Sequence, residues 1–176
     1  MYAQIDENTS NSFANLKGEL YVLQYPQKYM ISSGTGKSAH ELVSFDNALI
    51  SAKISNYNLL RVSSILPIGC KQTDTIDKLE GSALLVAYGS ISSNTPNETI
   101  ASAVSIGIPT SEGQVGVIME HAGVCSAAEA ESVVREMAAT AMSNHGIMCK
   151  EILSSSVEAT VTGTDYVTVI SSVAMW

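Results

Sequence analysis

The chain has 176 residues, of which 45% are hydrophobic and only 15% are charged, and its formal net charge is -8. This length allows one domain with a sizeable core, and the sparse charge suits a protein that buries part of its surface against copies of itself. The acidic balance and the absence of any basic run exclude nucleic acid as an expected partner.

The N-terminal part of the chain is expected to be a tail followed by strands. Residues 1–18 are polar, which predicts a loose tail before a single domain of residues 19–176. Apolar segments predict strands at residues 19–25 and 28–32. A glycine turn is expected next, at SGTGKS from Ser33 to Ser38, because this stretch lacks the first glycine of a phosphate-binding loop.

The middle of the chain predicts a helix and then mostly strands. A short amphipathic helix is expected from Ser44, its N-cap, with Asp46 in the first turn, where the helix dipole favours an anion. The run LLRVSSIL predicts a strand over residues 59–66, and a polar loop follows from Gly69 to Gly81. Further strands are predicted at residues 83–91, 100–109, 116–123, 154–161 and 166–176.

The clearest helix begins at Ser126. This serine forms a capping box with Glu129, and apolar residues follow at helical spacing until Gly146. With about eight strands and two helices, the pattern predicts an α/β or α+β single domain with antiparallel hairpins.

Cysteine usage bears on location and on metal binding. Cys70, Cys125 and Cys149 are too widely spaced for a zinc site or a disulfide framework, and the N-terminus has no signal-peptide pattern. We therefore expect a cytoplasmic protein without a bound metal. No stretch approaches the roughly 18 apolar residues of a membrane span, so no membrane partner is expected.

Two places invite a chemical interpretation. Glu120 ends the apolar strand VGVIME, and a carboxyl group at a strand end beside apolar surface is suited to proton donation, although a solvated carboxylate also fits. Ser63 and Ser64 are adjacent within an apolar run, where strand geometry would direct them to opposite faces. One would then face inward and need a hydrogen-bond partner, as an ordinary buried hydroxyl also does.

Four segments in consistent order resemble the archaeal type of pyruvoyl-dependent arginine decarboxylase. They are FDNALISAKISNYNLLRVSSILP, AYGSISSNTPNETIASAVSIGIP, GVIMEHAGVCSAAEAESVVREMA and SVAMW. The likeness extends from about residue 25 to residue 176. Asn58, Arg61 and the SSI serines lie at the family's spacing, as do Asp46 and the IME glutamate.

The resemblance implies a four-layer αββα sandwich that cleaves its own chain between Ser63 and Ser64. The Ser64 hydroxyl would attack the Ser63 carbonyl to give an ester. Elimination and hydrolysis would then leave a pyruvoyl group, derived from Ser64, as the covalent cofactor, with loss of ammonia. Asn58 is the implied side-chain donor for this step.

The resemblance also implies decarboxylation of L-arginine to agmatine, a step in polyamine biosynthesis. Glu120 matches the acid that reprotonates the product, and Asp46 matches the carboxylate that receives the guanidinium group. These groups would meet between protomers of a homotrimer, alone or as a dimer of trimers. His121 and the loop from Gly69 to Gly81 depart from the family pattern. A decarboxylase for another basic amino acid therefore stays open, as does an uncleaved non-enzymatic paralogue acting as an assembly or regulatory subunit.

Overall fold

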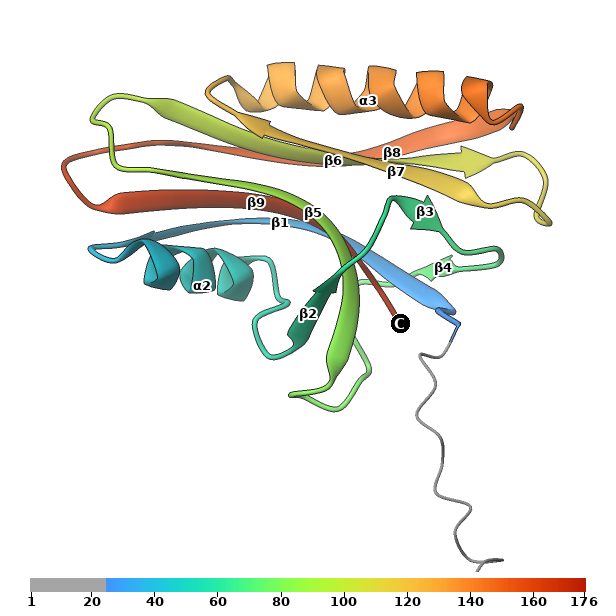
Figure 1. Ribbon diagram of the computed structural model, residues 1–176, viewed down its shortest axis with the longest axis horizontal. Coiled ribbons are helices and arrows are strands. Elements are labelled where there is room, and N and C mark those ends of the chain that lie inside the picture. The colour runs from blue at the N-terminus through green and yellow to red at the C-terminus, as the bar shows by residue number, and fades with distance from the viewer. Residues whose placement is uncertain (1–24) are drawn as a thin grey trace, which may run out of the picture.

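Two β-sheets face each other in the computed structural model, which describes residues 25–176 (Figure 1). The first sheet has the strand order β2-β5-β9-β1-β4, and the second has the order β3-β7-β6-β8. The strands are β1 (Lys28–Ser38), β2 (Asn58–Arg61), β3 (Ile65–Leu66), β4 (Lys71–Gln72), β5 (Ala83–Ser93), β6 (Thr99–Pro109), β7 (Gly116–Gly123), β8 (Cys149–Thr160) and β9 (Tyr166–Met175). Helices α2 (Glu41–Ser51) and α3 (Ala127–Asn144) pack on the outer faces of the first and second sheets, which makes an α+β domain.

The main core lies between the two sheets. Ala87 and Val173 of the first sheet meet Val104 and Ile118 of the second. Strand β9 is buried on both of its faces, because Val173 points to the second sheet while Ile170 packs with α2. Because both faces are buried, β9 contains no charged residue, and its buried serines and threonine are hydrogen-bonded to other side chains.

The predicted glycine turn at SGTGKS is wrong, because the whole segment belongs to β1. Gly34 and Gly36 instead create space for α2, which crosses this strand. A Cβ atom at Gly36 would lie 2.1 Å from the Ser44 carbonyl oxygen, and one at Gly34 would lie 2.4 Å from that of Ala48. The glycines are therefore needed for close packing of helix on strand rather than for a change of chain direction.

The predicted N-cap at Ser44 is also wrong. Helix α2 begins at Glu41 after His40, whose side chain makes no capping hydrogen bond. Ser44 lies buried inside the helix, where its Oγ donates to the Glu41 carbonyl oxygen at 2.7 Å and lies 2.6 Å from Thr168 Oγ1. The Ser44 hydroxyl therefore satisfies its hydrogen bonding by donating to the preceding helical turn. An N-cap hydroxyl would instead accept a hydrogen bond from a backbone N–H.

Other predicted elements agree well with the structure. The capping box of Ser126 and Glu129 opens α3 as predicted. Strands β5, β6, β7 and β9 closely match their predicted ranges, while β8 begins earlier than predicted, at Cys149. The short strand β4 interrupts the predicted loop from Gly69 to Gly81. The tail predicted at residues 1–18 and most of the strand predicted at 19–25 lie outside the described residues.

The single strand predicted over residues 59–66 is wrong, and this difference positions the candidate site. Strand β2 ends at Arg61 in the first sheet, and β3 begins at Ile65 in the second. Residues 62–64 cross from one sheet to the other (Figure 1). The sequence pattern does not reveal a change of sheet, because each short strand places a leucine in the interior, Leu59 on the side of α2 and Leu66 between the two sheets.

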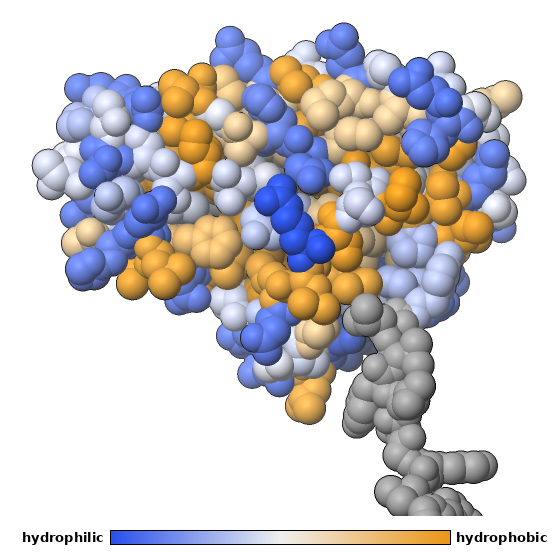
Figure 2. Space-filling view, viewed as in Figure 1, coloured by the Kyte–Doolittle hydropathy of each residue, from blue (hydrophilic) through white to orange (hydrophobic). Residues whose placement is uncertain are grey.

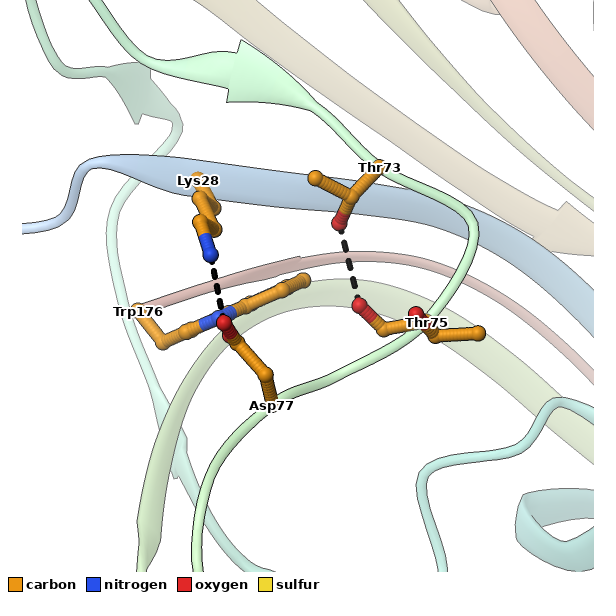
Figure 3. A network of polar contacts seen from close by, with 5 residues as sticks. All are labelled: Lys28, Thr73, Thr75, Asp77 and Trp176. Atoms are coloured by element: carbon orange, nitrogen blue, oxygen red, sulfur yellow. Dashed lines mark hydrogen bonds and ion pairs between the residues drawn. The ribbon is translucent and has the colours of Figure 1, made fainter.

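The C-terminus is fastened to β1 by a polar network (Figure 3). Asp77 pairs with the Lys28 ammonium and accepts a hydrogen bond from Trp176 Nε1 at 2.5 Å. The hydrogen bond from Lys28 has the largest effect and that from Trp176 the next largest, and together they lower the pKa of Asp77 below its ordinary value. Neither of the described helices is long and apolar enough to cross a membrane.

Candidate active site

The Ser63–Ser64 peptide is held between the two sheets. On one side, the Val62 N–H donates to the Val86 carbonyl oxygen of β5 at 3.2 Å. On the other, the Ser64 carbonyl oxygen accepts from the Ile118 N–H of β7 at 2.8 Å. The chain therefore has a fixed residue on each side of this peptide, although residues 62–64 are not part of a strand.

The carbonyl group of Ser63 has a hydrogen-bond donor of its own. The Ile65 N–H donates to the Ser63 carbonyl oxygen at 2.8 Å, which closes a three-residue turn about Ser64. A donor at this oxygen polarises the carbonyl and would stabilise negative charge that develops there. The turn thus prepares the Ser63 carbonyl for attack by a nucleophile.

The hydroxyl of Ser64 points to a carboxylate. Its Oγ donates to Glu120 Oε2 at 3.1 Å, and both side chains are partly buried. Glu120 is brought from β7 in the second sheet, close to Gly89 of β5 in the first. A Cβ atom at Gly89 would lie 3.2 Å from the His121 carbonyl oxygen and 3.5 Å from Glu120 Cβ, so glycine avoids a tight contact between the two strands here.

Arg61 lies on the other side of the Glu120 carboxylate. Its Nη2 is 3.9 Å from Glu120 Oε1 and donates to the Tyr88 carbonyl oxygen at 3.0 Å. Its Cζ lies 4.8 Å from the centre of the Tyr88 ring, which is cation–π geometry. The Tyr88 ring in turn lies 6.4 Å from that of Phe45 on α2, centroid to centroid.

The structure brings Ser63, Ser64 and Glu120 together but not the other two predicted site residues. Asn58 is exposed at the start of β2, where its Nδ2 donates to the Gly81 carbonyl oxygen at 2.6 Å. Asp46 is exposed on α2 and makes no side-chain hydrogen bond or ion pair with any part of the chain that the structure describes. Its neighbour Phe45, rather than Asp46 itself, connects α2 to the site.

Sequence reasoning missed the contributions of Ile65, Tyr88 and Gly89. Ile65 acts through its backbone N–H and Gly89 by having no side chain, so residue type carries little signal for them, whereas Tyr88 acts through both its carbonyl oxygen and its ring. The Tyr88 ring could have been suspected only once β5 was known to lie beside Arg61. Within residues 25–176, no group of three or more potential metal ligands occurs, and all three cysteines are unpaired.

Comparison with known proteins gives one consistent result. A family model described as pyruvoyl-dependent arginine decarboxylase matches residues 28–176. The chain is also similar to proteins named pyruvoyl-dependent arginine decarboxylase from several archaea. The one from Methanocaldococcus jannaschii is 39% identical over 136 residues, which cover 77% of this chain and 82% of the relative. Those from Methanococcus vannielii and Pyrococcus horikoshii are 37% and 36% identical, covering 80% and 77% of this chain and 86% and 87% of the relatives.

Proposed function

The chain belongs to the pyruvoyl-dependent arginine decarboxylase family, and we propose that it cleaves itself between Ser63 and Ser64 and then converts L-arginine to agmatine and carbon dioxide. One observation carries this proposal. The Ser64 hydroxyl donates to a carboxylate while the carbonyl that it would attack already accepts an N–H hydrogen bond. A nucleophile, a base and an oxyanion donor therefore surround one peptide bond.

The first step is transfer of the Ser63 acyl group from nitrogen to oxygen. Glu120 accepts the proton as Ser64 Oγ bonds to the Ser63 carbonyl carbon, and the Ile65 N–H stabilises the oxyanion. The bond between this carbon and the Ser64 nitrogen then breaks as the nitrogen takes the proton held by Glu120, which leaves an ester and a free amine. The hydrogen bonds of Val62 to β5 and of Ser64 to β7 hold this segment at both ends, so the Ser64 hydroxyl and the Ser63 carbonyl stay close to each other.

The second step separates the fragments. Loss of the Ser64 α-proton and cleavage of its Cβ–O bond release a carboxylate at Ser63 and leave dehydroalanine at position 64. Addition of water and loss of ammonia convert this residue into a pyruvoyl group. The group derives from the backbone and Cβ of Ser64, whose side chain lies against Glu120, so the surrounding residues fit it.

Asn58 is proposed as a second oxyanion donor. Its amide now donates to the Gly81 carbonyl oxygen at the far end of β2, so this role requires a rearrangement that brings Asn58 to Ser63. The Ile65 N–H requires no such change. We therefore assign Ile65 the larger share of oxyanion stabilisation and Asn58 a smaller one.

In the mature enzyme, the pyruvoyl group supplies a ketone that condenses with the substrate amine and withdraws electrons as carbon dioxide leaves. Glu120, which lies beside position 64, donates the proton that completes the product. Asp46 receives the guanidinium group of arginine, since a carboxylate can bind this planar group in bidentate fashion.

Assembly into a homotrimer, alone or paired as two trimers, would supply Asp46 from a neighbouring protomer. The exposed position of Asp46 supports this arrangement. The side chains near the cleavage segment include three exposed hydrophobic ones, Leu60, Ile65 and Ile68, which are 38–43% exposed. Figure 2 shows several hydrophobic patches among the hydrophilic residues of this face. Burial of such side chains against another copy would be favourable. We place this assembly, with protomers of the four-layer αββα type, in the cytoplasm.

Intact-mass spectrometry of the purified protein tests the proposal. Cleavage between Ser63 and Ser64 should give fragments of 63 and 113 residues, because 176 minus 63 is 113. The Ser64→Ala variant, which lacks the nucleophile, should remain whole. A wild-type chain that stays uncleaved would instead indicate a non-enzymatic paralogue. A cleaved chain that prefers ornithine or lysine to arginine would indicate a decarboxylase for another basic amino acid.

A further inference from the structure

The two carboxylate oxygens of Glu120 face different partners. Oε2 accepts the hydrogen bond from Ser64 Oγ at 3.1 Å, whereas Oε1 lies 3.9 Å from Arg61 Nη2. The terminal torsion of a glutamate is broad, so a single hydrogen bond does not fix the plane of its carboxylate. A second group on Oε1 restricts this rotation and keeps Oε2 directed at Ser64.

Arg61 is itself held in place by β5. Nη2 donates to the Tyr88 carbonyl oxygen at 3.0 Å, and Cζ lies over the Tyr88 ring. Arg61 comes from the end of β2, directly before the segment that crosses to the second sheet. The guanidinium group therefore has a fixed position relative to both the Ser63–Ser64 peptide and Glu120.

We propose that Arg61 is a positioning residue that orients the Glu120 carboxylate for proton transfer from Ser64. This inference rests on the proposed self-cleavage. The Arg61 side chain is 60% exposed and that of Glu120 is 21% exposed, and ion pairs at such exposure contribute little to stability. The effect therefore operates through orientation, and small misplacements of a catalytic group reduce rates by about tenfold or more.

A double-mutant cycle tests the coupling between the two residues. Wild type, Arg61→Ala, Glu120→Gln and the double variant are made by cell-free translation, and the appearance of the two fragments is followed by intact mass. Arg61→Ala should slow cleavage about tenfold in the wild-type background. In the Glu120→Gln background the same change should have no further effect, because Arg61 acts only through that carboxylate.

A matched control separates this role from a general loss of arginine contacts. Arg135, on α3, donates to the Ile152 carbonyl oxygen and to Ser154 Oγ of β8, away from the cleavage segment. The Arg135→Ala variant should therefore cleave at the wild-type rate. If Glu120→Gln cleaves too slowly for the cycle, chemical rescue decides instead. Added ethylguanidinium should restore cleavage of Arg61→Ala, since the exposed site allows it to enter, and should not affect Arg135→Ala.

The outcomes distinguish this inference from the proposed function. Multiplicative effects of the two substitutions, or a failure of ethylguanidinium to restore Arg61→Ala, would overturn the positioning role while self-cleavage stands. Such results would instead assign Arg61 to packing between β2 and β5. Absence of cleavage in the wild-type chain would overturn both proposals.

Discussion

The Ile65 N–H offers a direct test of how the precursor activates its own peptide bond. It is a single donor, 2.8 Å from the oxygen on which negative charge would develop. Replacing Ile65 with the corresponding α-hydroxy acid exchanges this N–H for an oxygen atom and keeps the side chain that packs in β3. Loss of one preorganised oxyanion donor typically slows a reaction by about 10²- to 10³-fold.

The assay is cell-free translation with a transfer RNA that carries the hydroxy acid, followed over time by intact-mass spectrometry. The fragment that ends at Ser63 should appear about 10²- to 10³-fold more slowly than in wild type. Hydrolysis of the introduced ester would cut one residue later, after Ser64, and mass separates the two products.

Val62 supplies a matched control. Its N–H donates to the Val86 carbonyl oxygen at 3.2 Å, so a hydroxy acid there also removes one backbone hydrogen bond from the same segment. This bond does not touch the Ser63 carbonyl, and a typical intramolecular hydrogen bond contributes only about 0.5–1.5 kcal/mol. The Val62 ester should therefore slow cleavage by roughly tenfold at most. Equal rates for the two esters would refute the special role of the Ile65 N–H.

Three further predictions concern turnover, packing and pH. After its slow self-cleavage is complete, the Glu120→Gln variant should release agmatine more slowly than wild type at saturating arginine. The Asp46→Asn variant should have a higher KM for arginine, and its preference for arginine over lysine should be weaker. Gly36→Ala should lower the free energy of unfolding by about 1–3 kcal/mol in a denaturant titration, because its Cβ would overlap α2. Gly113→Ala should have almost no effect, since its Cβ would meet only a side-chain oxygen at 3.9 Å. The lowered pKa of Asp77 means that its stabilising contribution is complete at neutral pH and is lost as pH falls through that pKa, so Asp77→Asn should lower Tm at pH 7 but not in strong acid.

Much of the fold could be predicted because several elements carry local signals that tertiary contacts do not override. The capping box at Ser126 indicated the start of α3, and uncharged apolar segments bounded by turn residues located four of the strands. The start of α2 was misplaced because His40 provides no side-chain cap while a buried serine follows three residues into the helix. Gly34 and Gly36 misled for a related reason, since glycine marks a turn or a close approach and the sequence alone does not separate these uses.

The candidate site was predictable only in part. Physical reasoning from the sequence left Ser63, Ser64 and Glu120 as separate possibilities, and the family resemblance joined them. Hydrogen bonding of Ser64 to Glu120 across 56 positions depends on the change of sheet at residues 62–64, which the apolar pattern concealed. The donor at Ile65 is a backbone atom that any residue except proline would supply, so no residue type could indicate it.

The position of the Ser63–Ser64 peptide explains how the chain could be cut without losing its fold. The first fragment would keep β1, α2 and β2, and β1 lies inside the first sheet between β9 and β4 of the second fragment. Strand β2 would remain paired with β5, while the Ser64 carbonyl oxygen would remain bonded to the Ile118 N–H of β7. Both new ends would thus stay attached to different sheets of one core. The proposed break at this position would therefore create a reactive terminus beside Glu120 and leave the strand pairing on either side intact.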